Sequence, residues 1–166
     1  MKLAKLTTIS IIIGILALPV AAFAAAQVTI DTLVEKQVVS EDNGTIQTRY
    51  VKTENTVPGD TLRFTLLFRN SGDAVAENVV IDNPIPSSTL YLAGSVTTYK
   101  QISPLFSIDS GKSFRKPSLL TYETTTPDGN TETKVASPEK YTHIRWQIPT
   151  LPPGESGQVS FEIIIQ

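Results

Sequence analysis

Apolar and polar residues alternate along several short stretches of this chain. In the stretch 61–69, every second side chain is apolar and most of those between are polar or charged. A period of two is typical of a β-strand with one buried face. Four apolar rows of this kind stand out, namely Leu62 to Phe68, Val79 with Ile81, Ile144 with Trp146 and Ile148, and Val159 to Ile165.

Turn-forming residues separate these stretches. Pro58-Gly59-Asp60 precedes the first row and Asn70-Ser71-Gly72-Asp73 follows it. Near the start, Asp42-Asn43-Gly44 joins two extended segments and predicts a type I′ hairpin. After residue 24 no stretch has a sustained helical period, so helix content should be small. These patterns predict an all-β fold, an antiparallel β-sandwich.

The first 24 residues have the pattern of a secretory signal peptide. Two lysines are followed by an apolar run over 6–18, a proline and the small-x-small sequence Ala22-Phe23-Ala24. A membrane helix needs about 20 apolar residues, more than this run contains. We therefore expect cleavage after Ala24 or after Ala26. The mature protein would then be secreted, periplasmic or at the cell surface, with no membrane span.

The remaining residues, 25–166, are predicted to form a single domain. Loss of Lys2 and Lys5 would leave 12 basic and 16 acidic residues, a net charge of −4, without a basic cluster. That charge argues against nucleic acid and anionic membranes as partners. The chain has no cysteine, which excludes disulfides, thiol catalysis and Cys-ligated metals.

Four motifs together resemble one family, the "domain of unknown function eleven" conserved-repeat domains of bacterial and archaeal surface proteins. They are VPGDT (57–61), NSGD (70–73), NVVIDNPIP (78–86) and LPPGES (151–156) after the strand of Trp146. The resemblance implies an immunoglobulin-like sandwich with a core of 57–97 and 141–166, and a surface, adhesive or matrix role. It implies no catalytic residues. A single copy, an extension over 27–56 and an insert over 98–140, expected to include a hairpin, depart from the family pattern.

The stretch SIDSGKSF, Ser107 to Phe114, matches the Asp-box pattern of sialidase propellers. Its expected role is local, because Asp109 can accept backbone N–H bonds across the turn and Gly111 can supply a positive φ. A glycosidase needs two placed carboxylates, and one motif in 142 residues cannot build a propeller. A hairpin is therefore the favoured interpretation, and no catalytic residue is predicted.

Neither a metal nor a cofactor site is predicted. His143 is the only histidine, and alternation places it on an outer face in a row with Tyr141, Arg145 and Gln147. This row is either an ordinary polar face or a ligand face, since Tyr and Arg are favoured at interfaces. The scattered turn aspartates follow no calcium-loop spacing.

Three aliphatic residues fall on rows that should face solvent, namely Leu67, Val80 and Ile164. Exposed aliphatics forgo burial energy, so something should cover them. Two covers are considered: the insert over 98–140, which is favoured, or another copy of the protein through strand addition by 27–39. With Tyr141 and Arg145, these three are the predicted partner contacts.

The function predicted is that of a non-enzymatic surface or extracellular-matrix protein, acting structurally or adhesively through protein contacts that include self-association. The alternative is an exported module that binds a ligand such as a glycan. Exposed aromatic side chains in the insert would favour the alternative, and buried ones the structural role; they are Tyr99, Phe106, Phe114 and Tyr122.

Overall fold

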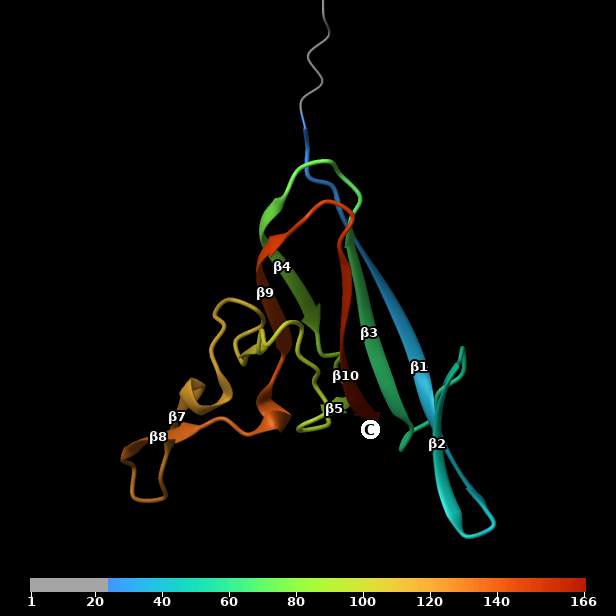
Figure 1. The fold of residues 1–166 in the computed structure, drawn as a ribbon. Coiled ribbons are helices and arrows are strands. Elements are labelled where there is room, and N and C mark those ends of the chain that lie inside the picture. Colours follow the sequence, from blue (N-terminus) through green and yellow to red (C-terminus); the bar gives the residue numbers. More distant parts are fainter. Residues whose placement is uncertain (1–23) are drawn as a thin grey trace, which may run out of the picture.

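The computed structural model describes residues 24–166, so the predicted signal peptide lies outside the described residues except for Ala24. Two antiparallel sheets face each other, as Figure 1 shows. The first sheet has the order β2-β1-β3-β10-β5, with β2 (Thr45–Lys52), β1 (Val28–Asp42), β3 (Thr61–Asn70), β10 (Ser156–Ile165) and β5 (Thr89–Tyr91). The second has the order β4-β9-β6, with β4 (Ala76–Pro84), β9 (His143–Leu151) and β6 (Leu105–Ser107).

The predicted apolar rows form the core between these sheets. On β3 and β10 the rows meet in register, and the rings of Phe64 and Phe161 stack with centroids 5.2 Å apart. On the second sheet Ile81 pairs with Trp146, and both side chains are fully buried. The predicted all-β sandwich is therefore confirmed, while its immunoglobulin-like character remains a prediction.

The N-terminal extension is the β1–β2 hairpin, and its turn is the predicted one. Asn43 and Gly44 have φ values of 49° and 77°, as a type I′ turn requires. β1 pairs antiparallel with β3, with Ile30 opposite Phe68. The segment considered for strand addition to another copy is therefore already part of this chain's own sheet, which argues against that alternative.

The insert does not lie flat on a sheet. It contains β6, two short 3-10 turns, η1 (Pro117–Leu119) and η2 (Pro138–Lys140), and a hairpin of β7 (Thr121–Thr125) and β8 (Thr131–Val135) that projects to the side in Figure 1. Just before the insert, the chain runs along β10, where the N–H of Thr97 donates to the carbonyl of Ser160 at 2.8 Å. The Trp146 indole N–H donates to the Thr97 carbonyl at 3.0 Å, which ties this segment to the second sheet. Thr97, the residue before the insert, therefore bridges the two sheets on one side of the sandwich.

Within residues 24–166, no helix is both long enough and apolar enough to cross a membrane.

Candidate functional site

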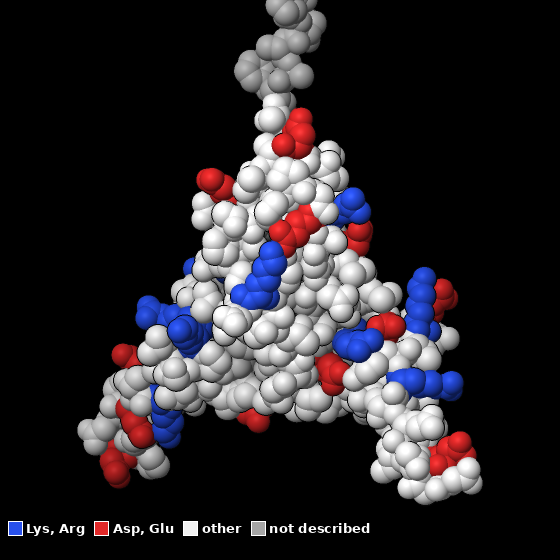
Figure 2. Space-filling model, viewed as in Figure 1, with Lys and Arg blue, Asp and Glu red and all other residues white. Residues whose placement is uncertain are grey.

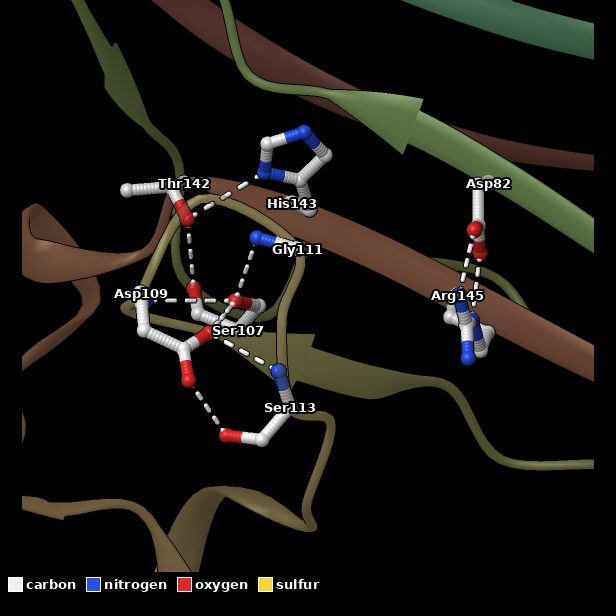
Figure 3. Close-up of polar contacts among 8 residues, drawn as sticks. All are labelled: Asp82, Ser107, Asp109, Gly111, Ser113, Thr142, His143 and Arg145. Atoms are coloured by element: carbon white, nitrogen blue, oxygen red, sulfur yellow. Dashed lines mark hydrogen bonds and ion pairs between the residues drawn. The ribbon is translucent and has the colours of Figure 1, made fainter.

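The Asp-box stretch forms a tight loop that begins at Ser107, the last residue of β6 (Figure 3). Several hydrogen bonds of the loop meet at the Ser107 hydroxyl. The Ser107 side chain is fully buried and its hydroxyl donates to Asp109 Oδ1 at 2.6 Å. The Ser107 hydroxyl oxygen also accepts the backbone N–H of Gly111 at 2.9 Å. Gly111 has a φ of 81°, the left-handed conformation that glycine adopts without strain. The expected turn chemistry is confirmed.

The carboxylate of Asp109 spans this loop. Its Oδ1 accepts the backbone N–H of Ser113 at 2.9 Å, and its Oδ2 accepts the Ser113 hydroxyl at 2.6 Å. The hydroxyls of Ser107 and Ser113, with the Ser113 backbone N–H, hold the pKa of Asp109 well below its usual range. Asp109 is therefore ionised at neutral pH and bonded on both oxygens, an arrangement that suits holding the turn better than donating a proton.

The loop rests on the outer face of β9. A Cβ added at Gly111 would come within 3.3 Å of the His143 ring, so the two are in close contact. Thr142 anchors the loop, because its hydroxyl accepts the Ser110 N–H at 3.1 Å and donates to the Ser107 carbonyl at 3.2 Å. His143 lies on the outer side of the sheet as expected, but the insert half-buries it.

Arg145 is already engaged within the chain. Its guanidinium donates to both carboxylate oxygens of Asp82, each at 2.6 Å, across the β4–β9 pair. The Phe114 ring lies 3.7 Å from the guanidinium carbon. The bond to Asp82 joins two strands of the second sheet, and the contact with Phe114 links the insert loop to that sheet. Arg145 is thus paired with a carboxylate and covered on one face.

The prediction that Tyr141 lies on the outer face with His143 and Arg145 is wrong. Its side chain is only 8% exposed, and its ring lies 4.6 Å from that of Phe106 and 5.9 Å from that of Tyr91, centroid to centroid. The strand β9 begins at His143, after the 3-10 turn η2. Alternation holds only inside a strand, so it could not place a residue in front of one.

The insert also leaves two of the three out-of-register aliphatics uncovered, contrary to the favoured expectation. Leu67 is 40% exposed and Val80 is 44% exposed. They lie on the outer faces of different sheets, so they do not form one surface. Ile164 is half-buried and pairs with Leu90 of β5. The insert covers the His143–Arg145 stretch instead.

An exposed apolar groove, which sequence reasoning missed, runs beside β4. Its volume is about 490 Å³, and Ile30, Val75 and Val80 are 44–49% exposed. We call this the β4 groove; it is lined by Ala26, Val28, Ile30, Val75, Ala76, Glu77, Val79 and Val80. Among the described residues, no strand pairs with the outer edge of β4. Ile30 stays exposed because the second sheet is three strands wide and does not reach across the five-stranded one.

A second, more enclosed pocket lies where the insert meets the sandwich. Its volume is about 390 Å³ and its lining is mostly apolar. The buried rings of Tyr91, Phe106 and Tyr141 contribute to it, and three prolines from the insert join them: Pro104, Pro117 and Pro138. We call this the aromatic pocket.

Over residues 24–166, no group of three or more His, Cys, Asp or Glu side chains is placed to hold a metal ion. No family model, curated protein or solved structure matches the chain. The resemblance to the conserved-repeat surface family therefore stays a prediction from the sequence motifs.

Proposed function

We propose that this protein is exported and acts as a structural or adhesive component at the cell surface or in the extracellular matrix, through protein–protein contact. The observation that carries the proposal is the β4 groove, in which exposed aliphatic side chains lie beside a free strand edge. The two features together are those that a contact by strand addition needs.

The backbone edge of β4 supplies the first half of such a contact. An edge strand presents N–H and C=O groups that another strand can pair with. Such a contact also needs apolar surface to bury. Ile30 of β1 supplies it on one side of the β4 edge, and Val80 of β4 supplies it on the other. A strand laid along β4 would cover both side chains and would widen the three-stranded sheet toward the width of the five-stranded one.

The simplest occupant is β4 of a second copy. Two identical strands can pair antiparallel about a twofold axis, which makes the contact self-complementary. On the face shown in Figure 2, acidic and basic side chains are interspersed and neither sign forms a continuous patch. Long-range charge repulsion between copies should therefore be small at physiological salt.

The aromatic side chains of the insert also support a structural role. Phe106 is buried, and Tyr99, Phe114 and Tyr122 are half-buried. Tyr99 packs edge-on against Phe68 with centroids 4.9 Å apart. Phe114 is held between Arg145 and His143. The rings of Tyr99 and Phe114 attach the insert to the sandwich, so these two offer little of the flat exposed area that stacks on sugars.

Light scattering of the 25–166 chain over a wide concentration range tests the proposal. We expect reversible dimerisation that Val80→Lys weakens at least tenfold, because lysine at an edge opposes strand pairing. Val135→Lys is the matched control, since Val135 is equally aliphatic and 60% exposed but lies on the β7–β8 hairpin. A monomer at every concentration, or equal effects of both variants, would refute self-association through β4.

The aromatic pocket favours a second candidate function, an exported ligand-binding module. Its volume and apolar lining suit an apolar group or the apolar face of a sugar ring. Ligand-detected NMR with small aromatic compounds and soluble glycans tests this. Ala93→Trp, at an exposed lining position, should fill the pocket and abolish binding. Binding that Ala93→Trp leaves unchanged would place the ligand elsewhere.

A further inference from the structure

The three residues that precede β1 are held by the loop that follows β3. The Ser71 N–H donates to the Gln27 carbonyl at 2.8 Å, and the Gln27 N–H donates to Asn70 Oδ1 at 3.1 Å. One step further back, the Asp73 N–H donates to the Ala25 carbonyl at 3.1 Å. The chain is therefore held in place up to Ala25.

Gly72 shows how closely the loop and this segment approach. A Cβ added at Gly72 would lie 2.1 Å from the Ala25 carbonyl oxygen and 2.5 Å from the Gln27 nitrogen. Only a residue without a side chain fits there. The loop over 70–73 is thus shaped around residues 25–27, and these residues are part of the folded domain.

The last contact in this series involves a charge. The backbone N–H of Ala25 donates to Asp73 Oδ1 at 2.6 Å. In the unprocessed chain that nitrogen is a neutral amide with one proton. Hydrolysis of the Ala24–Ala25 peptide bond adds water across it, leaving a carboxylate on the released leader and an α-ammonium group, with three protons, on Ala25.

We propose that the Asp73 carboxylate is the binding site for the α-ammonium group of the mature N-terminus, and that the leader is removed between Ala24 and Ala25. An ammonium–carboxylate hydrogen bond is stronger than the amide–carboxylate bond it replaces. Processing therefore strengthens an existing contact. The inference rests on the export proposed above and is independent of what the protein contacts afterwards.

Cleavage after Ala26 would have the opposite effect. It would remove Ala25 and both of its bonds to Asp73. The new ammonium group would be on Gln27, whose nitrogen faces the uncharged side-chain oxygen of Asn70. The geometry thus favours one of the two cleavage sites that the leader sequence alone leaves open.

The first test is the intact mass of the protein recovered from the periplasm or medium of a bacterial host that expresses the full chain. A mass that begins at Ala25 is expected. A chain that begins at Gln27 would overturn the inference while leaving export intact. An uncleaved chain would overturn both.

The second test measures the ion pair itself by thermal unfolding. Asp73→Asn keeps a hydrogen-bond acceptor and removes the charge, and we expect it to lower the Tm of the chain starting at Ala25 by about 1–4 °C. The same substitution should have a clearly smaller effect in a chain extended by Gly-Ser-Gly ahead of Ala25, where the nitrogen is again a neutral amide. Asp128→Asn, in the exposed β7–β8 turn, is the matched control for loss of one charge. Equal effects of Asp73→Asn in both chains would refute the pairing.

Discussion

Asn70, at the end of β3, donates a hydrogen bond from its side-chain amide to the carbonyl of Leu151 at 2.8 Å, and so joins one sheet of the sandwich to the other. The same amide nitrogen bonds the Ala74 carbonyl at 2.8 Å, and Oδ1 accepts from Gln27 and Gly72. Asn70 is completely buried. A buried polar side chain with four partners connects segments that the sequence separates widely.

Asn70→Ala should therefore lower the free energy of unfolding by about 2–4 kcal/mol, because it removes the side-chain partner of two carbonyls, one of them buried, and of two partly buried N–H groups. Urea unfolding followed by fluorescence measures this. Asn130→Ala, at the exposed β7–β8 turn, is the control and should change stability by less than about 0.5 kcal/mol. Equal losses of unfolding free energy in both variants would contradict a stabilising role of the Asn70 hydrogen bonds.

Asp109→Asn should change how stability depends on pH. The pKa of Asp109 is lowered in the folded protein, so its contribution is present above the unfolded pKa of about 4 and is lost as the pH falls below that value. The Tm advantage of the wild type over the variant should thus shrink from pH 5 to pH 2.

Ser107→Ala should give the same pattern as Asp109→Asn, since the Ser107 hydroxyl is the largest cause of the lowered pKa. Ser118→Ala, an exposed serine of the same insert, should match the wild type at every pH. A Tm difference between wild type and Asp109→Asn that stays constant with pH would contradict the proposed role of this carboxylate.

Phe161→Ala should be among the most damaging core substitutions. The ring is fully buried and stacks on Phe64 at the centre of the five-stranded sheet. Loss of such a side chain leaves a cavity and costs about 3–5 kcal/mol. Chemical denaturation measures it, with Val135→Ala on the exposed hairpin as the control. A loss below about 1 kcal/mol would mean that the two sheets can close over the gap.

Arg145→Lys should loosen the insert loop while the sandwich stays folded. Lysine lacks the planar fork that makes two parallel bonds to Asp82, and its ammonium group cannot lie flat on the Phe114 ring. The pair is partly exposed, so the expected stability loss is at most about 1 kcal/mol. Faster amide exchange over residues 107–114 is the more sensitive measurement. Arg115→Lys, at an exposed position, should leave those exchange rates unchanged.

Gly157→Ala tests the junction between β10 and the start of the insert. An added Cβ would lie 2.5 Å from both Phe68 Cζ and Tyr99 Cε2, so Tyr99 would have to move. We expect a loss of about 1–3 kcal/mol from this overpacking. Ser156→Ala, the exposed neighbour, controls for the change in strand propensity. Unchanged stability would show that the Tyr99 ring is free to rotate away.

Much of the fold could be predicted because it follows from local rules. Alternation placed the rows of β3, β4, β9 and β10 on the correct faces, and Asn43-Gly44 set the first hairpin through positive φ values. The Asp-box loop could also be predicted from local rules, because its hydrogen bonds join Ser107, Asp109 and Gly111, which lie within four residues of one another. Interactions over so short a span do not depend on the rest of the chain.

Other outcomes depended on which segments meet in space. Tyr141 is buried because the insert places Phe106 against it, and Arg145 is engaged because Asp82 and Phe114 reach it from different parts of the chain. Ile30 belongs to an inward row but remains exposed, because the facing sheet is too narrow to cover β1. Alternation determines which way a side chain points, whereas its burial depends on what lies opposite, and only the tertiary structure decides that.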